Sequence, residues 1–569
     1  MTDQTADPAG DAEACAREPI HLSGAIQPHG YLVSCVLPEW TVRQVSANVR
    51  ELLDVEPGEL LGQGLRDLFG QELLQALADA LGFVEEGAAP QRVASDNIGP
   101  FARLCDVSVH VGGGLVHLEI EPQQRAPAER APIVVAQGMI ARAAGAAGTA
   151  EFHDRVAEQV RMLTGYDRVM VYRFRHDDAG EVIAEALADG LEPYLGLRYP
   201  ASDIPAQARA LYLRNRLRVI PDAGYAPVPI LPGRDESGQP LDLSQHALRS
   251  VAPVHVEYLR NMGVAASMSI SIIAGGRLWG LIACHHRTPR LVPPTVRAAA
   301  DLFGMFVSMR VAADAQDAAA AHDEAAREAR EALGLRLAGG RDFAATLAAA
   351  LPDLAATLRA DGAGLWAGRR WQTVGRAPGT QALPALLHWA RHRQAAGMSA
   401  TERGVDWQAP GAPEPAVGVI GLDLGGEDWL FFFRPEEVED VRWAGDPRKP
   451  TVPTDDGRRI APRKSFRTWR ETVRGRSEPW GPDDQRRAER LRLVLRQHHR
   501  AGEDERNVTD MEAFRRRHVL REQRARLDQL STLLEGLVHL EDAETARLGE
   551  RIADLEADLR ALMHGDTLA

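Results

Sequence analysis

The stretch Pro200-Ala-Ser-Asp-Ile-Pro205 holds a carboxylate, Asp203, between two prolines that restrict the backbone on both sides. One interpretation is a helix that begins near Pro205 and takes Asp203 or Ser202 as its N-cap. The other is a stiffened segment that carries a functional carboxylate. The residues of this stretch alone leave both interpretations open, so the flanking sequence has to decide between them.

Short segments on both sides of this stretch alternate apolar and polar residues, and a period of two predicts strands. Helices are expected over Glu59–Leu81, over Glu151–Thr164, and from Pro294 to about Leu337, where almost every residue favours helix. A further mixed block follows, up to about residue 500. The pattern indicates an α+β protein with three antiparallel-sheet domains joined by long helices. The predicted strands include 31–37, 105–110, 115–120, 167–175, 181–188, 267–273 and 278–285.

The composition of the 569 residues excludes several classes of protein. Apolar residues make up 45% and charged residues 26%, which excludes a wholly disordered or collagen-like chain. The net charge of −14 argues against bulk nucleic-acid binding and favours a cytoplasmic protein. The longest apolar stretch, 264–284, is broken by a Gly-Gly-Arg turn, so no membrane span is predicted. The four cysteines form no CxxC pair or close zinc spacing, so no metal site is predicted either.

No enzyme motif is found in the chain. It contains no GxxxxGK, HExxH or GxSxG pattern. His518 and His539 stand in a helical tail without any sign of an ATP-binding domain, and we expect them to be solvated. The sequence therefore predicts a protein that is not an enzyme.

The tail, about 508–563, has the heptad spacing of a coiled coil. Its apolar residues follow steps of three and four, with a stutter of four between two runs. Such a stripe needs a partner helix, most simply from a second copy, although packing on its own domain is the alternative. The residues of the stripe are Leu527, Leu530, Leu534, Leu537, Leu548, Ile552, Leu555, Leu559 and Leu562.

Five motifs in order make the chain resemble a bacteriophytochrome photosensory module, a PAS–GAF–PHY protein that binds the tetrapyrrole biliverdin. The motifs are Cys15–Gly30, Pro200–Pro205, Tyr258–Gly263, Leu278–His286, and a PHY tongue that contains Trp443–Pro450 and Pro462–Phe466. The resemblance implies a flexible segment 1–18, a PAS domain 19–130, a GAF domain 131–312, a PHY domain 313–503 with its tongue at 443–480, and a coiled coil 504–569.

The resemblance also implies how the cofactor, biliverdin IXα, is held. Cys15 would form a thioether with its A-ring vinyl group, because Val254 stands where relatives with other bilins have a GAF cysteine. The backbone carbonyl of Asp203 and the ring of His255 would serve the pyrrole N–H groups, while the Asp203 side chain would meet the tongue. Arg218 and Arg249 would bind the propionates. The remaining implied site residues are Ile204, Pro205, the hydroxyl donors Tyr212, Ser267 and Ser269, and the D-ring pocket of Met170, Tyr172, Tyr194, Tyr199, Tyr258 and His285.

The implied function is that of a red/far-red photoreceptor switched between Pr and Pfr by Z/E isomerisation at C15=C16. Asp203 would then exchange partners in the tongue, Arg463 in Pr and Ser465 in Pfr, while Trp443, Phe466 and Trp469 offer alternative apolar anchors. A homodimer would pass the change to a downstream protein such as a response regulator. Two alternatives are the sensory fragment of a light-regulated histidine kinase and a bilin- or haem-binding module without photochemistry.

Overall fold

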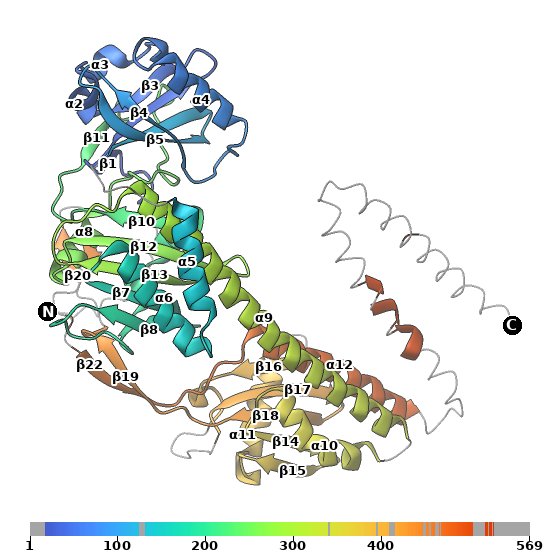
Figure 1. The fold of residues 1–569 in the computed structure, drawn as a ribbon. Coiled ribbons are helices and arrows are strands. Elements are labelled where there is room, and N and C mark those ends of the chain that lie inside the picture. Colours follow the sequence, from blue (N-terminus) through green and yellow to red (C-terminus); the bar gives the residue numbers. More distant parts are fainter. Residues whose placement is uncertain are drawn as a thin grey trace.

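The structure is a computed structural model of residues 1–569. It describes residues 18–123, 131–339, 342–393, 397–408, 416–447, 451–454, 457–460, 466, 468–504, 518–521, 523–525, 527–528 and 553. The first domain, a central domain and a third domain follow one another along the molecule (Figure 1). Apart from a few helical residues, the predicted coiled coil over 504–569 lies outside the described residues.

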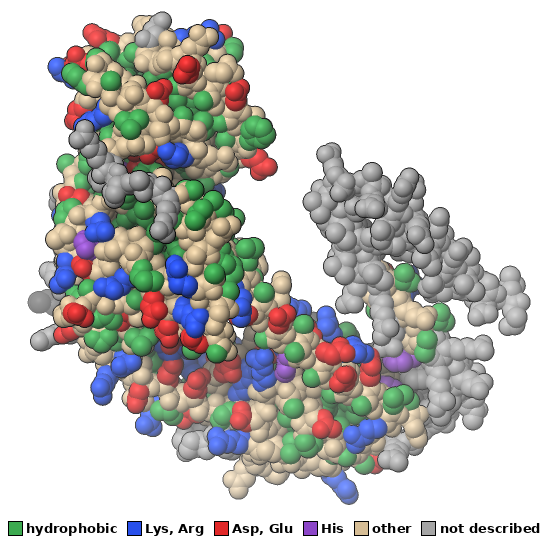
Figure 2. All heavy atoms as spheres, in the orientation of Figure 1, with side chains coloured by type: hydrophobic (Ala, Val, Ile, Leu, Met, Phe, Trp, Pro, Cys, Tyr) green, Lys and Arg blue, Asp and Glu red, His purple; other side chains and the backbone are tan. Residues whose placement is uncertain are grey.

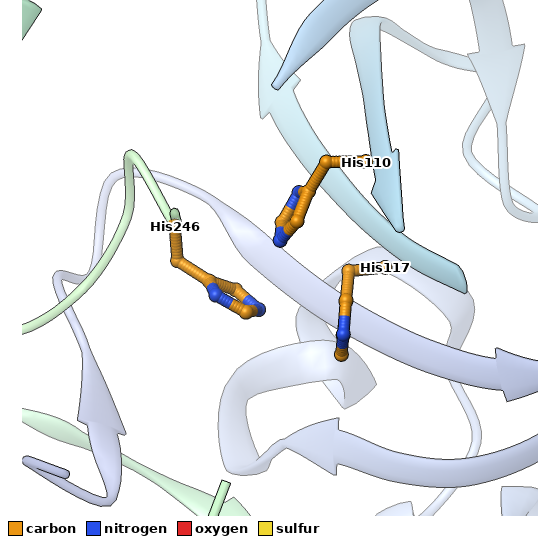
Figure 3. Close-up of side chains that lie close together, drawn as sticks. All are labelled: His110, His117 and His246. Atoms are coloured by element: carbon orange, nitrogen blue, oxygen red, sulfur yellow. The ribbon is translucent and has the colours of Figure 1, made fainter. Parts of the chain in front are cut away.

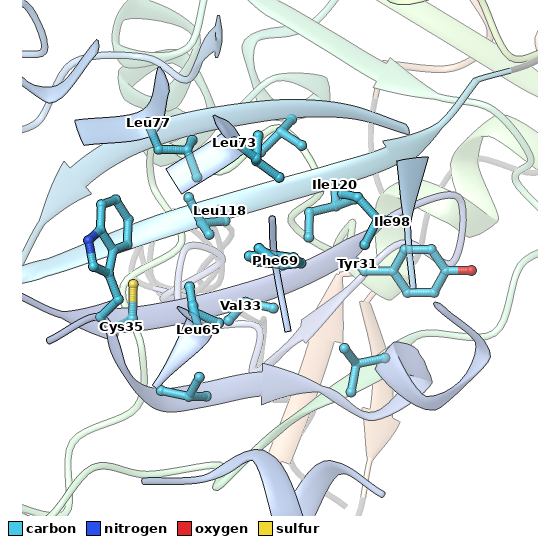
Figure 4. Packing of buried hydrophobic residues seen from close by; sticks show 14 of the residues in the cluster. Tyr31, Val33, Cys35, Leu65, Phe69, Leu73, Leu77, Ile98, Leu118 and Ile120 are labelled. Carbon is cyan, nitrogen blue, oxygen red and sulfur yellow. The ribbon is translucent and has the colours of Figure 1, made fainter. Parts of the chain in front are cut away.

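The first domain is built on a seven-stranded sheet that covers a single apolar core. Tyr31, Val33, Phe69 and Leu118 are among the buried residues of this core (Figure 4). Cys35 and Cys105 are buried strand residues, as predicted. In spatial order the strands are β1 (Ala25–Ile26), β11 (Val228–Leu231), β3 (Thr41–Ser46), β2 (Tyr31–Val36), β6 (Leu115–Pro122), β5 (Arg103–Gly112) and β4 (Gln91–Ile98).

The helix predicted over Glu59–Leu81 is wrong as a continuous element. The structure has a short helix α3 (Pro57–Leu60), a 3₁₀ turn (Leu65–Asp67) and then α4 (Gln71–Leu81). Between them Gly62 adopts φ +79°, and its N–H donates to the carbonyl of Val42 on β3. The backbone of this segment therefore forms hydrogen bonds with the neighbouring strand instead of continuing the helix. Apolar periodicity does not reveal that strand bonds compete with helix bonds here.

The central domain contains an eight-stranded sheet with helices on both faces. Helices α5 (Pro132–Ala144), α6 (Thr149–Thr164) and α9 pack on one face, and α7 (Ala206–Arg214) and α8 (Pro253–Asn261) contribute to the other side. In spatial order the strands are β10 (Leu217–Ile220), β12 (Ala266–Ala274), β13 (Arg277–His286), β7 (Arg168–Phe174), β8 (Gly180–Leu187), β9 (Arg198–Tyr199), β19 (Glu439–Ala444) and β22 (Thr468–Val473).

The third domain repeats the α+β plan. Helices α10 (Phe343–Thr357), α11 (Leu383–Arg393) and α12 (Pro482–Asp504) accompany a five-stranded sheet. The sheet order is β15 (Arg370–Gly375), β14 (Gly362–Ala367), β18 (Asp428–Arg434), β17 (Gly418–Gly425) and β16 (Met398–Thr401). A hairpin of β20 (Thr451–Thr454) and β21 (Gly457–Ile460) stands apart from it. The predicted fold class, three sheet domains joined by a long helix, is confirmed.

Helix α9 (Pro294–Ala338) joins the central and third domains. Its 45 residues span about 68 Å at the usual helical rise. Phe303 and Val307 near its start are buried in the central core, and Leu333 and Leu337 near its end are buried in the third. The helix is therefore a rigid connection between the two cores, as its sequence predicts (Figure 1).

A loop of the central domain also reaches into the first. Strand β11 from this loop pairs with β3 on one side and with β1 on the other. The N–H of Gln27 donates to the carbonyl of Leu248 (2.7 Å), and the N–H of Ser250 donates to the carbonyl of Ala25 (2.9 Å). Ile26, fully buried between these contacts, ties the two domains together.

The surface carries charges of both signs. Acidic and basic side chains are interspersed over the face of the three domains seen in Figure 2. Among the described residues, every helix is too short or too polar to cross a bilayer.

Candidate functional site

Two adjoining cavities lie against the side of the central sheet that faces away from α5, α6 and α9. Their empty volumes, which include space open to solvent, are ≈ 1090 and ≈ 730 Å³. Strand alternation explains which side chains reach them, because neighbouring residues of one strand point to opposite faces. On β12, Ser267 and Ser269 line the second cavity while Met268 and Ile270 are buried in the helix-covered core.

The other wall comes from the segment around Asp203 and from helices α7 and α8. Asp203, Ile204, Tyr212, His255 and Tyr258 each line both cavities, so the two form one continuous slot. Pro205 lines the first cavity alone. The sequence-predicted site residues from Met170 to His285 thus converge on one place, with Tyr194 as the exception.

Asp203 is not a helix cap. Helix α7 begins after Pro205 and has no side-chain cap hydrogen bond. Asp203 instead accepts a hydrogen bond from the hydroxyl of Tyr258 at 3.2 Å. The ring of Tyr258 stacks beside that of His255, with centroids 6.0 Å apart. Of the two interpretations of the proline-flanked stretch, the structure therefore excludes the helix N-cap, and the functional carboxylate stays a prediction.

Two buried arginines line the first cavity. Arg218 donates to the backbone carbonyls of Ala247 (2.8 Å) and Arg249. Arg249 donates to the carbonyl of Ile20 at 3.1 Å, and its buried Nε has no hydrogen-bond partner within the described part of the chain. Burial and the neighbouring Arg218 charge lower the pKa of Arg249 to about 9. No carboxylate side chain of the described residues is paired with either guanidinium, so the site favours an added anion.

The second cavity is an aromatic pocket with polar atoms that lack partners. The rings of Tyr172 and Tyr199 lie 5.8 Å apart, and Met170 lines the same wall. The Tyr199 hydroxyl and His285 Nδ1 are buried without a hydrogen bond to any described residue. Desolvation, with the nearby Arg168 and His255 charges, lowers the pKa of His285 to about 3, so its imidazole is neutral. A ligand with polar edges would satisfy both atoms.

Tyr194 differs from the expectation. It lines neither cavity and instead packs behind the pocket, where the guanidinium of Arg168 lies 3.6 Å from its ring centroid. Tyr194 therefore supports the aromatic wall from outside.

Part of the tongue is docked beside the slot. Strand β19 pairs in parallel with β9 through Trp443 and Arg198, and Glu439 forms a salt bridge with Arg198. The ring of Phe466 packs edge-on against Tyr258, with centroids 5.1 Å apart. Trp443 faces Trp469 across the β19–β22 pair, and its indole N–H donates to Glu471 at 2.7 Å. The described part of the 443–480 segment thus contacts the central domain.

Three predicted residues, Cys15, Arg463 and Ser465, lie outside the described residues. The described chain nevertheless enters the slot soon after Cys15, because Glu18 and Ile20 both line the first cavity.

Several lining residues escaped the sequence reasoning. Leu281 and Ala283 were detectable, because they are in phase with His285 along β13. The others, on loops, short helices and the end of the four-residue strand β10, carry no periodic signal. They are Ser202, Gln207, Ala208, Leu211, Asn215, Ile220, Val251, Ala252, Leu259 and Met262.

Comparisons with known proteins agree with this architecture. The PAS fold family matches residues 15–123, the GAF domain 150–311 and the phytochrome region 326–502. A bacteriophytochrome from R. palustris has a crystal structure with a TM-score of 0.73 at 35% identity, covering 86% of this chain and 99% of that one. The photosensory core module of Stigmatella aurantiaca phytochrome gives 0.72 at 37% identity, covering 85% and 97%.

Curated relatives extend the match. The bacteriophytochrome of Pseudomonas aeruginosa is 39% identical over 84% of this chain, which spans 66% of that relative's length. The bacteriophytochrome of Xanthomonas campestris is 35% identical, with 85% of this chain and 78% of the relative covered. Fold and slot define a sensory module of the PAS–GAF–PHY class. By these relationships the chain belongs to the bacteriophytochromes, within the phytochrome photoreceptor family.

Proposed function

We propose that this chain is a red/far-red photoreceptor that binds biliverdin IXα through a thioether at Cys15. The observation that carries the proposal is the continuous slot. Asp203, His255 and Arg218 lie where its two cavities meet, Arg249 lines the first cavity, and the second cavity is an aromatic pocket. A planar tetrapyrrole with two propionates has the complementary pattern.

The residues present fit that group. Asp203 and His255 lie where both cavities meet, so they can hold the protons of the pyrrole nitrogens. Arg249, whose Nε lacks a partner, and Arg218 can bind propionate oxygens. Ser267 and Ser269 line the second cavity, where they can act as hydroxyl donors. In the aromatic pocket His285 can donate or accept one hydrogen bond at the end ring.

The bound bilin supplies light absorption and a Z/E isomerisation at its C15=C16 bond. The protein has to convert a changed hydrogen bond in the chromophore slot into a changed contact between the slot and the tongue. Tyr258 connects the two, because its hydroxyl bonds Asp203 while its ring packs on Phe466 of the tongue. A shift of Tyr258 would therefore loosen Phe466 and favour a second packing of the tongue, in which Arg463 and Ser465 exchange at Asp203.

The output we propose is non-enzymatic and cytoplasmic. Helix α9 would carry the change between the cores, and a homodimer formed partly by the heptads of 504–569 would present it to a downstream protein such as a response regulator. The mixed surface charge gives no support to nucleic-acid binding on the face shown (Figure 2).

The test is the absorption spectrum of biliverdin-loaded protein before and after red and far-red light. We expect a reversible exchange between a red-absorbing and a far-red-absorbing form. A loaded protein with an unchanged spectrum after both illuminations would reduce the proposal to a bilin-binding module.

Gly180 offers a more local test of the pocket. A Cβ built at this residue of β8 would overlap the phenol ring of Tyr172, so Gly180→Ala has to displace that ring from its place in the wall of the second cavity. Overpacking of this kind costs about 1–3 kcal/mol. We expect a shifted red band and weaker photoconversion in the spectrum. Gly148→Ala, where a Cβ has open space, is the matched control and should behave as wild type. Equal spectra for both variants would contradict the pocket assignment.

A further inference from the structure

Three histidines from distant parts of the sequence meet at the junction of the first and central domains. His110 lies on β5, His117 on β6, and His246 on the loop that carries β11 into the first sheet. One ring nitrogen from each can be chosen so that all three lie within 4.8 Å of one another. Figure 3 shows the three rings turned toward a common point.

The cluster is closed off from solvent. Each of the three side chains is 1% exposed. The ring of His246 contacts the other two edge-on, with centroid distances of 4.3 Å to His110 and 4.6 Å to His117. Burial lowers the pKa of all three rings, so they are neutral and offer lone pairs.

Hydrogen bonding does not explain why the rings are there. Both nitrogens of His110 and both of His246 are buried and lack any hydrogen-bond partner in the described part of the chain. His117 differs, because its Nδ1 lies 2.8 Å from the Ser34 hydroxyl and its Nε2 lies 3.1 Å from the Gly112 carbonyl. Four unpaired ring nitrogens in one small volume are unusual for a packed interior, where buried polar groups are nearly always satisfied.

We propose that His110, His117 and His246 bind a divalent transition-metal ion, most favourably Zn²⁺, which fastens the loop of the central domain to the first sheet. Three neutral imidazoles are a recurrent Zn²⁺ ligand set, and a water molecule can fill the fourth position. Ligand nitrogens around Zn²⁺ stand about 3.4 Å apart, so the rings would close by roughly 1 Å. One of the two existing contacts of His117 would remain and orient its ring.

The site would act on the chromophore slot through the loop. The carbonyls of His246 and Ala247 accept hydrogen bonds from Arg218, which lines the first cavity. The backbone N–H groups of Ala247 and Leu248 donate to Glu119 on β6, at 3.1 and 3.2 Å. Fixing His246 to β5 and β6 would therefore stiffen the same loop segment that positions Arg218.

Zinc retention by the 569-residue chain prepared without bilin tests the proposal, since no tetrapyrrole then competes for the metal. After removal of metal, addition of ZnCl₂ and gel filtration, we expect about one Zn²⁺ per chain. His246→Gln and His110→Gln should each weaken binding by about 100-fold or more, because each removes a ligand. Zinc should raise the thermal unfolding midpoint of the wild type and leave that of both variants unchanged.

The matched control addresses a competing surface pair. His388 and His392 lie exposed one turn apart on α11, with ring centroids 4.1 Å apart, and could also take up zinc. His392→Gln disrupts this surface pair and leaves the buried cluster intact, so this variant should retain the metal. Loss of zinc in His392→Gln, equal retention in His246→Gln, or no zinc on the wild type would overturn the proposal.

X-ray absorption of the zinc-loaded wild type gives a result that does not depend on how the variants fold. Three imidazole nitrogens at about 2.0 Å are expected, and a shell with fewer imidazoles or with sulfur would contradict the site.

Discussion

Serine in place of Cys15 is expected to reduce zinc-induced bilin fluorescence on a denaturing gel to background, because no other described cysteine can replace it. Thioether formation needs a thiol that can ionise to the reactive thiolate, and burial in apolar surroundings disfavours that ionisation. Burial raises the pKa of Cys35 to about 12. Burial also raises the pKa of Cys105 to about 11, because its effect and that of the Asp106 charge together exceed the opposing effect of the Arg103 charge. It also raises that of Cys284, which is fully buried in the central sheet.

Cys105→Ser is the matched control for this prediction. It removes a buried thiol on β5, away from the slot, and the fluorescent band should persist. The Cys15→Ser protein should still hold bilin non-covalently, because the slot and its arginines are intact, so an absorption band in the native state is expected together with the lost gel signal. A fluorescent Cys15→Ser band would show that attachment occurs elsewhere.

Local pattern predicted those elements whose stability is local. Strand β7 was expected at 167–175 and spans Arg168–Phe174, and α9 was expected from Pro294 to about Leu337 and ends at Ala338. Both have strong periodicity or uniformly high helix propensity. The site residues were recognised through motif order, since a lone Ser269 or Arg218 carries no signal of its own.

Local sequence patterns do not predict pairing between residues that are far apart in the sequence. The two-residue strand β1 exists because Ala25 pairs with Pro229, and β19 joins the central sheet because Trp443 pairs with Arg198. The histidine cluster has the same origin, since residues 110, 117 and 246 show no ligand spacing in sequence. Contacts of this kind depend on how domains dock, and no local window contains that information.

The docking of β19 leads to the second large effect. Arg198 of β9 and Glu439, at the start of the strand β19 that leads into the tongue, form a two-pronged ion pair, with side-chain exposures of 9% and 33%. Arg175 lies 3.8 Å from the same carboxylate. Glu439→Gln would leave the Arg198 guanidinium without its carboxylate partner, while Arg175 keeps Glu181 at 3.2 Å. Because the pair is only partly buried, we expect a cost of about 1–3 kcal/mol for this tongue packing.

That cost should appear in the photocycle and not in chromophore binding. Neither Arg198 nor Glu439 lines the slot, so bilin attachment in Glu439→Gln should equal that of the wild type. The equilibrium between tongue packings should move away from the strand-paired form by roughly 5- to 150-fold, which is that cost converted to an equilibrium constant. The rate of dark recovery after illumination, followed by absorption, measures this shift.

Arg442→Ala on the same strand is the control for Glu439→Gln, because Arg442 makes an exposed contact with the carbonyl of Leu195 at 3.3 Å. Exposed contacts contribute little to stability, so its dark recovery should remain within about twofold of wild type. If Glu439→Gln and Arg442→Ala had the same rate of dark recovery, the Arg198–Glu439 ion pair would have no part in the switch. Among the contacts of the described residues, the coupling between slot and tongue would then rest on Phe466 against Tyr258, and Phe466→Ala should alter dark recovery instead.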